Sequence, residues 1–155
     1  WGYFPWGPFA DVAEYSAHVH RVFYSPHTSL LFTVWSTVEP DGHTPVPNGP
    51  RLVGVVGLIA TVPDHRRTEV GPVLYASAYR GTFVNKAAVA TVLTWTFETL
   101  GFLRVEWKCD ARNDASFYAA KSLGFVHEGD FRAHMVLPDG FVRTSRYLAI
   151  VQSEW

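Results

Sequence analysis

The amino-acid sequence predicts a single domain of mixed α/β structure, and three observations lead to this prediction. Segments with the two-residue period of strands alternate with segments of helical period, in the order helix, three strands, helix, strand, helix, two strands. The chain of 155 residues is long enough to bury one substantial core. No internal repeat or low-complexity tract divides it. The predicted domain therefore spans residues 1–155.

The boundaries of these elements follow from apolar spacing and from turn residues. Apolar side chains recur at helical spacing from Val12 to Val22, and Pro26 ends that pattern. Asp139 and Gly140 form a favoured hairpin dipeptide between the last two strands. In chain order we expect a helix over residues 11–25, strands over 30–38, 51–62 and 69–75, a helix ending near 100, a strand over 104–110, a helix over 114–123, and strands over 125–137 and 141–151.

Two further helix ends carry recognisable caps. The helix before residue 101 has apolar residues at helical spacing, and Gly101 stands where a left-handed cap would end it. Asn113 is a typical N-cap for the next helix, and Gly124 is its expected stop. Within the strand over residues 69–75, Pro72 has no N–H to donate, so a bulge or splay is predicted there.

Composition limits the possible partners and the compartment. The formal net charge is −1 with both signs scattered, which argues against a nucleic-acid-binding surface. Cys109 is the only cysteine, which excludes an internal disulfide and fits a reducing, cytoplasmic location. No apolar run reaches the ~20 residues of a membrane span. Trp1 replaces an initiator Met, so the chain starts inside a longer protein or follows processing, and the domain would then lack its first strand.

The loop before the second long helix has the charge of an anion site. Residues 79–86 hold Arg80 and Lys86, and no Asp or Glu occurs from Val70 to Phe97. A helix N-terminus carries unpaired N–H groups and partial positive charge, so a lysine in its first turn is unfavourable unless an anion lies there. The loop therefore indicates a phosphate site, the alternative being cations that simply face water.

Other conspicuous residues allow two interpretations each. The aromatic rings of residues 1–9 are expected to pack in the core, or else to line an acceptor pocket. His134 is expected to be a hydrogen-bonded structural histidine or to border the same pocket. The spacing of the histidines indicates no metal site, so no metal is expected.

The residues 104–136 contain the strand end VEWKCDARN, then AAKSLGF, then EGDFR, and this combination resembles the GNAT superfamily of acetyl-CoA-dependent N-acetyltransferases. The resemblance is to the branch that contains the ribosomal-protein N-terminal acetyltransferases. It implies a mixed, mostly antiparallel sheet of six or seven strands flanked by helices. In that fold the strand at residues 69–76 splays from the strand at 104–110 and leaves a wedge for the pantetheine arm of acetyl-CoA, the expected co-substrate.

The resemblance also implies where acetyl-CoA binds. The backbone of residues 73–75 would polarise the thioester carbonyl, the loop would hold the pyrophosphate, and Asn113 would bond the pantetheine or only cap its helix. The implied cofactor-binding residues are Val73, Leu74, Tyr75, Arg80, Gly81, Thr82, Val84, Asn85, Lys86 and Asn113. The loop departs from the family pattern, because Gly81 is displaced and Phe83 and Val84 are bulky.

The catalytic residues implied by the resemblance are Glu69, Ser116 and Asn113. Glu69 is the candidate base, as the only carboxylate expected near the thioester; the alternative is an ordinary strand residue. Many relatives carry a tyrosine acid four residues before the glycine of the GF pair, where this chain has Ala120. Ser116, on the same helical face as Ala120, is the replacement we favour, and Tyr118 is expected on another face.

The function implied is transfer of an acetyl group from acetyl-CoA to a primary amine by direct attack in a ternary complex. The acceptor stays open among a protein N-terminus, a polyamine, an amino sugar and a xenobiotic amine. We expect a monomer or homodimer with no nucleic-acid or membrane partner. The alternative is a non-catalytic acyl-CoA-binding or protein-interaction module on the same fold.

Overall fold

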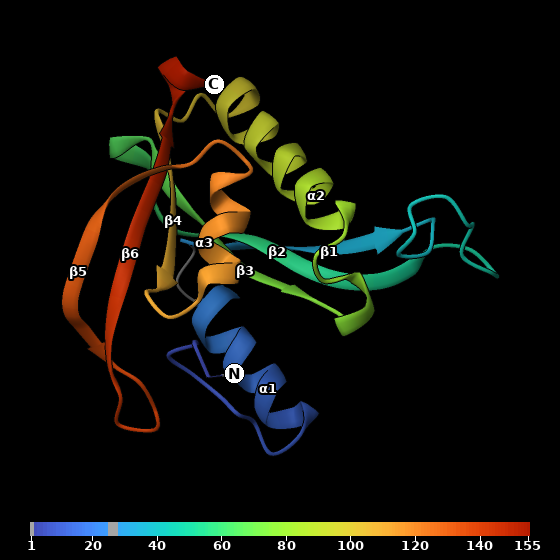
Figure 1. Ribbon diagram of the computed structural model, residues 1–155, viewed down its shortest axis with the longest axis horizontal. Coiled ribbons are helices and arrows are strands. Elements are labelled where there is room, and N and C mark those ends of the chain that lie inside the picture. The colour runs from blue at the N-terminus through green and yellow to red at the C-terminus, as the bar shows by residue number, and fades with distance from the viewer. Residues whose placement is uncertain (1, 25–27) are drawn as a thin grey trace.

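The protein is described by a computed structural model that covers residues 2–24 and 28–155 (Figure 1). Trp1 and the predicted helix end at Pro26 lie outside the described residues. The helices are α1 (Val12–Val19), α2 (Phe83–Thr94) and α3 (Asp114–Lys121). The strands are β1 (Leu30–Ser36), β2 (Arg51–Val62), β3 (Arg67–Tyr75), β4 (Arg104–Asp110), β5 (Val126–Val136) and β6 (Val142–Val151). The predicted order of elements is confirmed.

The six strands form one sheet in the order β1-β2-β3-β4-β6-β5. Every neighbouring pair is antiparallel except β3 with β4. The parallel pair follows from connectivity, because α2 carries the chain across the sheet between β3 and β4. The prediction of a mixed, mostly antiparallel sheet flanked by helices is confirmed.

The main hydrophobic core lies between the sheet and the helices α2 and α3, which pass in front of the strands in Figure 1. Val89, Leu93 and Phe97 supply its α2 side, and Val105 and Trp107 supply part of its sheet side. The predicted face of the helix is thus the buried one. The aromatic N-terminal segment packs elsewhere, where Trp6 meets His18 and Phe23 of the first helical region.

The first two helices continue as π-helices, which the sequence pattern did not predict. α1 continues as a π-helix over His20–Tyr24, and α2 continues as a π-helix over Trp95–Thr99. After α2, the Thr96 hydroxyl donates to the Val92 carbonyl at 2.7 Å. In a regular α-helix that carbonyl accepts from the backbone N–H four residues later, so the hydroxyl competes with this N–H. The Leu100 amide then bonds to the Trp95 carbonyl, five residues back. Gly101 ends the helix with φ of +67°, as predicted.

One glycine of β2 is required for close approach of the strands beside it. A Cβ on Gly57 would lie 2.6 Å from the Gly71 carbonyl oxygen of β3 and 2.8 Å from the Leu30 carbonyl oxygen of β1. These atoms belong to backbone and cannot turn aside. Gly57 therefore lets three strands pack at the point where β3 is irregular.

Candidate active site

The two central strands separate after a short parallel contact. β3 and β4 pair only at Arg67 with Arg104, Thr68 with Val105 and Glu69 with Glu106, and Figure 1 shows them running apart. On its other side β3 has a register shift against β2, where Gly71 and Pro72 face Gly57 alone. The predicted splay and bulge are both confirmed. Between the strands opens a cavity of about 1410 Å³.

The cavity is lined by almost all of the residues expected to bind acetyl-CoA. Those present in its walls are Val73, Leu74, Tyr75, Arg80, Gly81, Thr82, Asn85, Lys86 and Asn113. The exception is Val84, which is buried in a second cluster with Val53 and Tyr79. Because β3 makes no ladder contact with β4 beyond Glu69, its backbone groups on that side remain available to a ligand.

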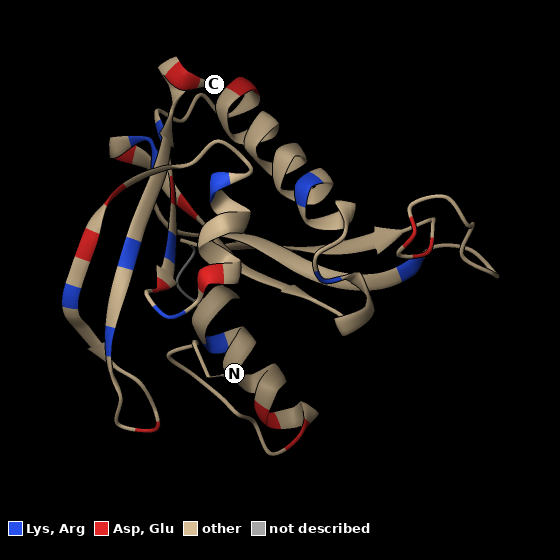
Figure 2. Ribbon diagram, in the orientation of Figure 1, with Lys and Arg blue, Asp and Glu red and all other residues tan. Residues whose placement is uncertain are grey.

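The loop before α2 is shorter than the expected residues 79–86, because the helix already begins at Phe83. Thr82 is the N-cap, since its hydroxyl oxygen accepts from the Val84 amide at 3.4 Å. Lys86 therefore lies in the first turn, and no carboxylate pairs with it or with Arg80 among the described residues. Figure 2 shows α2 free of acidic residues up to its π-helical end. In the same turn, Asn85 Oδ1 is buried and has no hydrogen-bond partner in the described structure.

The bulky loop residues leave this helix terminus accessible. Phe83 lies against Gly42, and the Val84 side chain points into the protein. Gly81 has φ of +71°, with nothing within 4 Å of the position a Cβ would take. Neither Phe83 nor Val84 lines the cavity. The departure from the usual family loop thus does not close the site.

Glu69 lies on β3 in the cavity wall, where its side chain is 13% exposed. Its carboxylate accepts from Lys108 Nζ at 2.9 Å, and the same ammonium contacts Glu106 at 2.9 Å. Burial raises the pKa of Glu69, while the positive charge of Lys108 acts in the opposite direction. Burial also works to lower the pKa of Lys108, but Glu69 and Glu106 outweigh it and the pKa is raised. The site thus holds a carboxylate of increased basicity next to a firmly charged ammonium.

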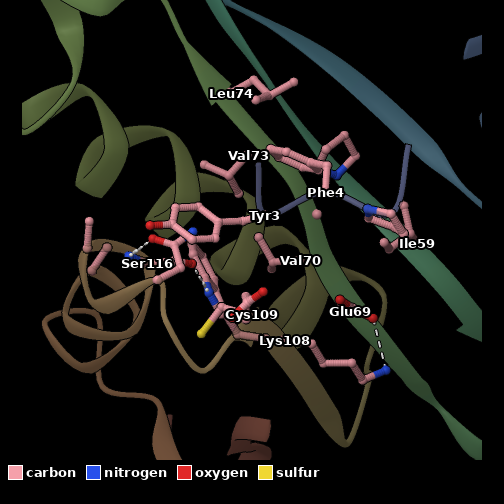
Figure 3. Close-up of a pocket in the computed structure, with 18 of the residues that line it drawn as sticks. Tyr3, Phe4, Ile59, Glu69, Val70, Val73, Leu74, Lys108, Cys109 and Ser116 are labelled. Carbon is pink, nitrogen blue, oxygen red and sulfur yellow. Dashed lines mark hydrogen bonds and ion pairs between the residues drawn. The ribbon is translucent and has the colours of Figure 1, made fainter. Parts of the chain in front are cut away.

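Ser116 lies on α3, on the opposite side of the cavity from Glu69 and Lys108 in Figure 3, with Tyr3 and Val70 between them. The indole N–H of Trp107 donates to Ser116 Oγ at 3.0 Å. Asn113 Oδ1 accepts from the Ser116 amide at 3.1 Å, which confirms the predicted N-cap. Ser116 Oγ accepts from the indole, and a hydrogen bond from the Ser116 side chain acts to lower the pKa of the neighbouring Cys109 thiol.

The faces of α3 differ in part from expectation. Tyr118 is 66% exposed and lies outside the cavity wall, on another face as predicted. Ala120 was expected to share the face of Ser116, but it is fully buried in the core, and Ala119 lines the cavity instead. Ser116 and Ala120 therefore have different surroundings although they are four residues apart: Ser116 faces the cavity and Ala120 faces the core. A tyrosine at position 120 would enter the core.

Sequence reasoning missed several polar residues of the cavity. Asp110 also lines it, which corrects the expectation that Glu69 is the only carboxylate there, but Arg112 binds both Asp110 oxygens at 2.8 and 3.1 Å. Lys108 and Arg143 line it as well. Strand alternation gave a partial signal, because Lys108 lies between buried residues of β4, and Arg143 is itself buried where its neighbours on β6 are not.

The N-terminal aromatic segment and His134, whose interpretation was open, both reach the cavity. Tyr3, Phe4 and Trp6 line it, and Phe4 also packs against Trp6; Trp1 lies outside the described residues. His134 lines it too, and its two ring nitrogens contact Ser145 Oγ at 2.9 Å and the Tyr147 hydroxyl at 3.2 Å. His134 is thus both hydrogen-bonded and at the border of the pocket.

Cys109 is buried and shares the core with Trp107, although part of it reaches the cavity. Burial raises the pKa of its thiol, so the thiol is protonated at neutral pH and a poor nucleophile. Within the described part of the chain, no three side chains gather that could together ligate a metal ion. None of the helices described has the length and apolar character needed to cross a bilayer.

A mixed sheet opened between two parallel strands, with an acid-free helix N-terminus beside the opening, defines the class of GNAT-like folds. The chain matches the family described as "Acetyltransferase (GNAT) domain" over residues 1–126. It therefore belongs to the GNAT acetyltransferase family. The match does not distinguish branches within that family.

Individual relatives agree with this assignment. The uncharacterized N-acetyltransferase YoaA of Bacillus subtilis is 30% identical over 84 residues, which cover 54% of this chain and 47% of that protein. A probable GNAT-family acetyltransferase from Chromobacterium violaceum shares 30% identity with a TM-score of 0.85, covering 100% of this chain and 72% of that one. A spermidine N-acetyltransferase from Vibrio cholerae, solved with CoA and spermine, shares the fold at 18% identity with a TM-score of 0.76, covering 98% and 82%.

Proposed function

We propose that this chain transfers an acetyl group from acetyl-CoA to a primary amine by direct attack in a ternary complex. The observation that carries the proposal is the cavity between β3 and β4, which brings the Glu69 carboxylate, the Ser116 hydroxyl and a helix N-terminus without acidic residues into one space. The cavity is formed by one domain, and we propose that residues 1–155 function as a single acyltransferase domain in the cytoplasm.

The residues present fit acetyl-CoA. The cations Arg80 and Lys86 and the N–H groups of α2 would hold its pyrophosphate, and the open edge of β3 would lie along its pantetheine arm. Asn113 lines the same wall and is placed to bond the arm while it caps α3. Acetyl-CoA supplies the activated acetyl group.

Proton removal from the amine, polarisation of the carbonyl and protonation of the thiolate are each assigned to groups of the cavity. The amine nitrogen forms a bond to the acetyl carbon as the carbon–sulfur bond breaks. The amine proton goes to Glu69, directly or through water, because burial makes that carboxylate a better base. Backbone N–H groups of residues 73–75 polarise the carbonyl, and the Ser116 hydroxyl passes a proton to the departing thiolate while it takes one from water, so the serine is restored. The neutral, buried thiol of Cys109 supports attack without an acyl-enzyme.

The class of acceptor and the branch of the family are also proposals. The motifs resemble the ribosomal-protein N-terminal acetyltransferases, so a protein N-terminus is one acceptor to test. The Vibrio cholerae relative, which acts on spermidine, makes a polyamine another. An amino sugar and a xenobiotic amine complete the panel.

The experiment combines binding with turnover. Calorimetry with CoA and with acetyl-CoA measures binding, and release of free thiol from acetyl-CoA is then followed over the four classes of amine. Binding together with amine-dependent thiol release is the expected result. Binding of CoA without thiol release for any amine would favour the alternative, a non-catalytic acyl-CoA-binding or interaction module. No binding of either compound would contradict both functions.

A further inference from the structure

Arg143 is a buried cation in the cavity wall that no step of the proposed reaction uses. It lies on β6, where Arg143, Ser145 and Tyr147 alternate toward one face. The residue is 6% exposed, and the cavity is lined by it. It stands across β4 from the loop that carries Arg80 and Lys86. The pyrophosphate expected at that loop therefore does not account for it.

The charges of Asp110 and Glu69 act on the guanidinium of Arg143, but no carboxylate of the described residues forms an ion pair with it. Its one hydrogen bond is from Nη1 to the carbonyl oxygen of Tyr3 at 3.1 Å, and Nε has none within the described structure. The two carboxylates of the cavity are already held, Asp110 by Arg112 and Glu69 by Lys108. No ion pair links Arg143 to any carboxylate of residues 2–24 and 28–155.

A guanidinium presents five N–H donors and is charged at every physiological pH. Burying it without a carboxylate is unfavourable, and burial indeed lowers the pKa of Arg143. A bound anion would remove this penalty, since guanidinium and carboxylate match in charge and in planar geometry. The same wall is apolar where the N-terminal segment and the first helical region meet it, at Phe4, Trp6 and Phe23.

We propose that Arg143 binds the carboxylate of the acceptor and that the acceptor is a free α-amino acid with an apolar side chain. This inference rests on the proposed function and names its substrate. The amine is directed to Glu69, whose charge acts on Arg143 across the cavity. The side chain lies against the rings of Tyr3, Phe4 and Trp6. A protein N-terminus lacks the α-carboxylate, which its first peptide bond has consumed.

A polyamine is the opposite case. It would bring several positive charges next to a guanidinium that forms no ion pair among the described residues, so the cavity disfavours it. An amino acid, its amide and spermidine differ in the charge that they bring next to Arg143. Comparing their kcat/KM values therefore distinguishes the possible acceptors by charge.

The test compares phenylalanine with phenylalaninamide, leucine with leucinamide, and both pairs with spermidine. In each pair only the carboxylate changes. The amide has the less protonated amine and would react faster if the carboxylate made no contact, so a higher rate for the acid indicates that the carboxylate is bound. We expect kcat/KM to be at least about tenfold higher for the acids, the equivalent of one charged hydrogen bond. Arg143→Gln should remove this preference mainly through KM, while Arg143→Lys should keep part of it.

Arg132→Gln is the matched control, because Arg132 is an exposed cation on the neighbouring strand β5. It should leave the preference intact. Acetyl-CoA affinity by calorimetry should be unchanged in all three variants. If Arg143→Gln fails to fold, the preference of the unaltered protein still decides the question.

The outcomes distinguish this inference from the proposed function. Equal rates for acids and amides, a preference for spermidine, or an equal loss for both members of a pair in Arg143→Gln would overturn the role of Arg143 while acetyl transfer stands. If no amine releases thiol, acetyl transfer fails, and calorimetry of phenylalanine against phenylalaninamide in the presence of CoA decides the role of Arg143. Tighter binding of the acid supports it, and equal binding contradicts it.

Discussion

At the scale of single residues, the chemistry of the cavity depends on the pair Glu69 and Lys108. Burial raises the pKa of the Glu69 carboxyl, and the ammonium 2.9 Å away limits that rise. Glu69 can accept a proton only when it is ionised, so activity should fall as the pH falls through its pKa. Lys108 therefore decides how far into the acidic range the enzyme works.

Replacing Lys108 by Met removes the charge that lowers the pKa of Glu69. The pKa then rises further, and the acidic limb of kcat/KM against pH should move to higher pH. Glu69→Gln should remove the limb and lower turnover by roughly 10²–10⁴-fold, the usual contribution of a general base. CoA binding should survive both changes. An unmoved acidic limb in Lys108→Met would show that another group, or solvent, accepts the proton.

Removing the Ser116 hydroxyl should slow acetyl transfer. Ser116→Ala removes the hydroxyl whose oxygen accepts from Trp107, and turnover should fall by about 10²–10⁴-fold if loss of the thiolate limits the rate. Acetyl-CoA affinity should change little. Tyr118→Phe is the control, since that exposed ring lies outside the cavity. Measured kcat values that fall for Tyr118→Phe and not for Ser116→Ala would reverse the assignment, and two silent variants would leave protonation to water.

The sequence placed some of these residues and not others, for a physical reason. Glu69, Asn113 and Ser116 lie in or beside the motifs that carry the family resemblance, so that resemblance was enough to expect them at the cavity. Lys108 and Arg143 acquire meaning only from contacts with Glu69, 39 residues away, and with Tyr3, 140 residues away. The alternation of buried and exposed residues identifies both as strand residues, but it cannot show which distant residues their side chains contact.

At the scale of elements, the order and type of the helices and strands could be predicted, because most have an apolar period and the last two strands flank the Asp139-Gly140 turn. The start of α2 could not, since Phe83 and Val84 look like obstacles in a loop and are in fact the first turn after the Thr82 cap. The π-helical ends were missed as well. A threonine that bonds back to its own helix leaves no apolar signature.

Replacing Gly57 by alanine should destabilise the packing of three neighbouring strands. Gly57→Ala would place a methyl group 2.6 Å from a β3 carbonyl and 2.8 Å from a β1 carbonyl. Overpacking of this kind costs about 1–3 kcal/mol, so the melting temperature should fall and the bulge in β3 should shift. Gly2→Ala is the matched control, with no atom within 4 Å of the new methyl. Thermal unfolding of both variants checks the difference, and equal melting temperatures would mean that the strands move apart freely.

At the scale of the whole molecule, ligand binding and folding are linked. A ligand that binds only the folded chain stabilises it by about 2.7 kcal/mol at 100 times its dissociation constant. CoA should therefore raise the melting temperature, and the Arg80→Glu, Lys86→Glu double variant should lose that rise because the anion site becomes acidic.

Without CoA the double variant should be no less stable than the unaltered protein. A carboxylate in the first turn of α2 suits the helix dipole better than an ammonium and contributes about 0.3–1 kcal/mol. Differential scanning calorimetry with and without CoA measures both effects. An undiminished rise with CoA in the double variant would place the pyrophosphate elsewhere.

The three-pair contact between β3 and β4 divides the sheet into two antiparallel leaves, β1-β2-β3 and β4-β6-β5, that share a short hinge. Two ion pairs cross this hinge, Glu69 with Lys108 and Arg67 with Glu106 at 3.8 Å. The angle between the leaves is thus fixed where charges meet, and a small change of that angle is magnified at the far end of each leaf. The two ion pairs therefore join the leaves at the closed end of the cavity, and beyond Glu69 no ladder contact holds β3 to β4.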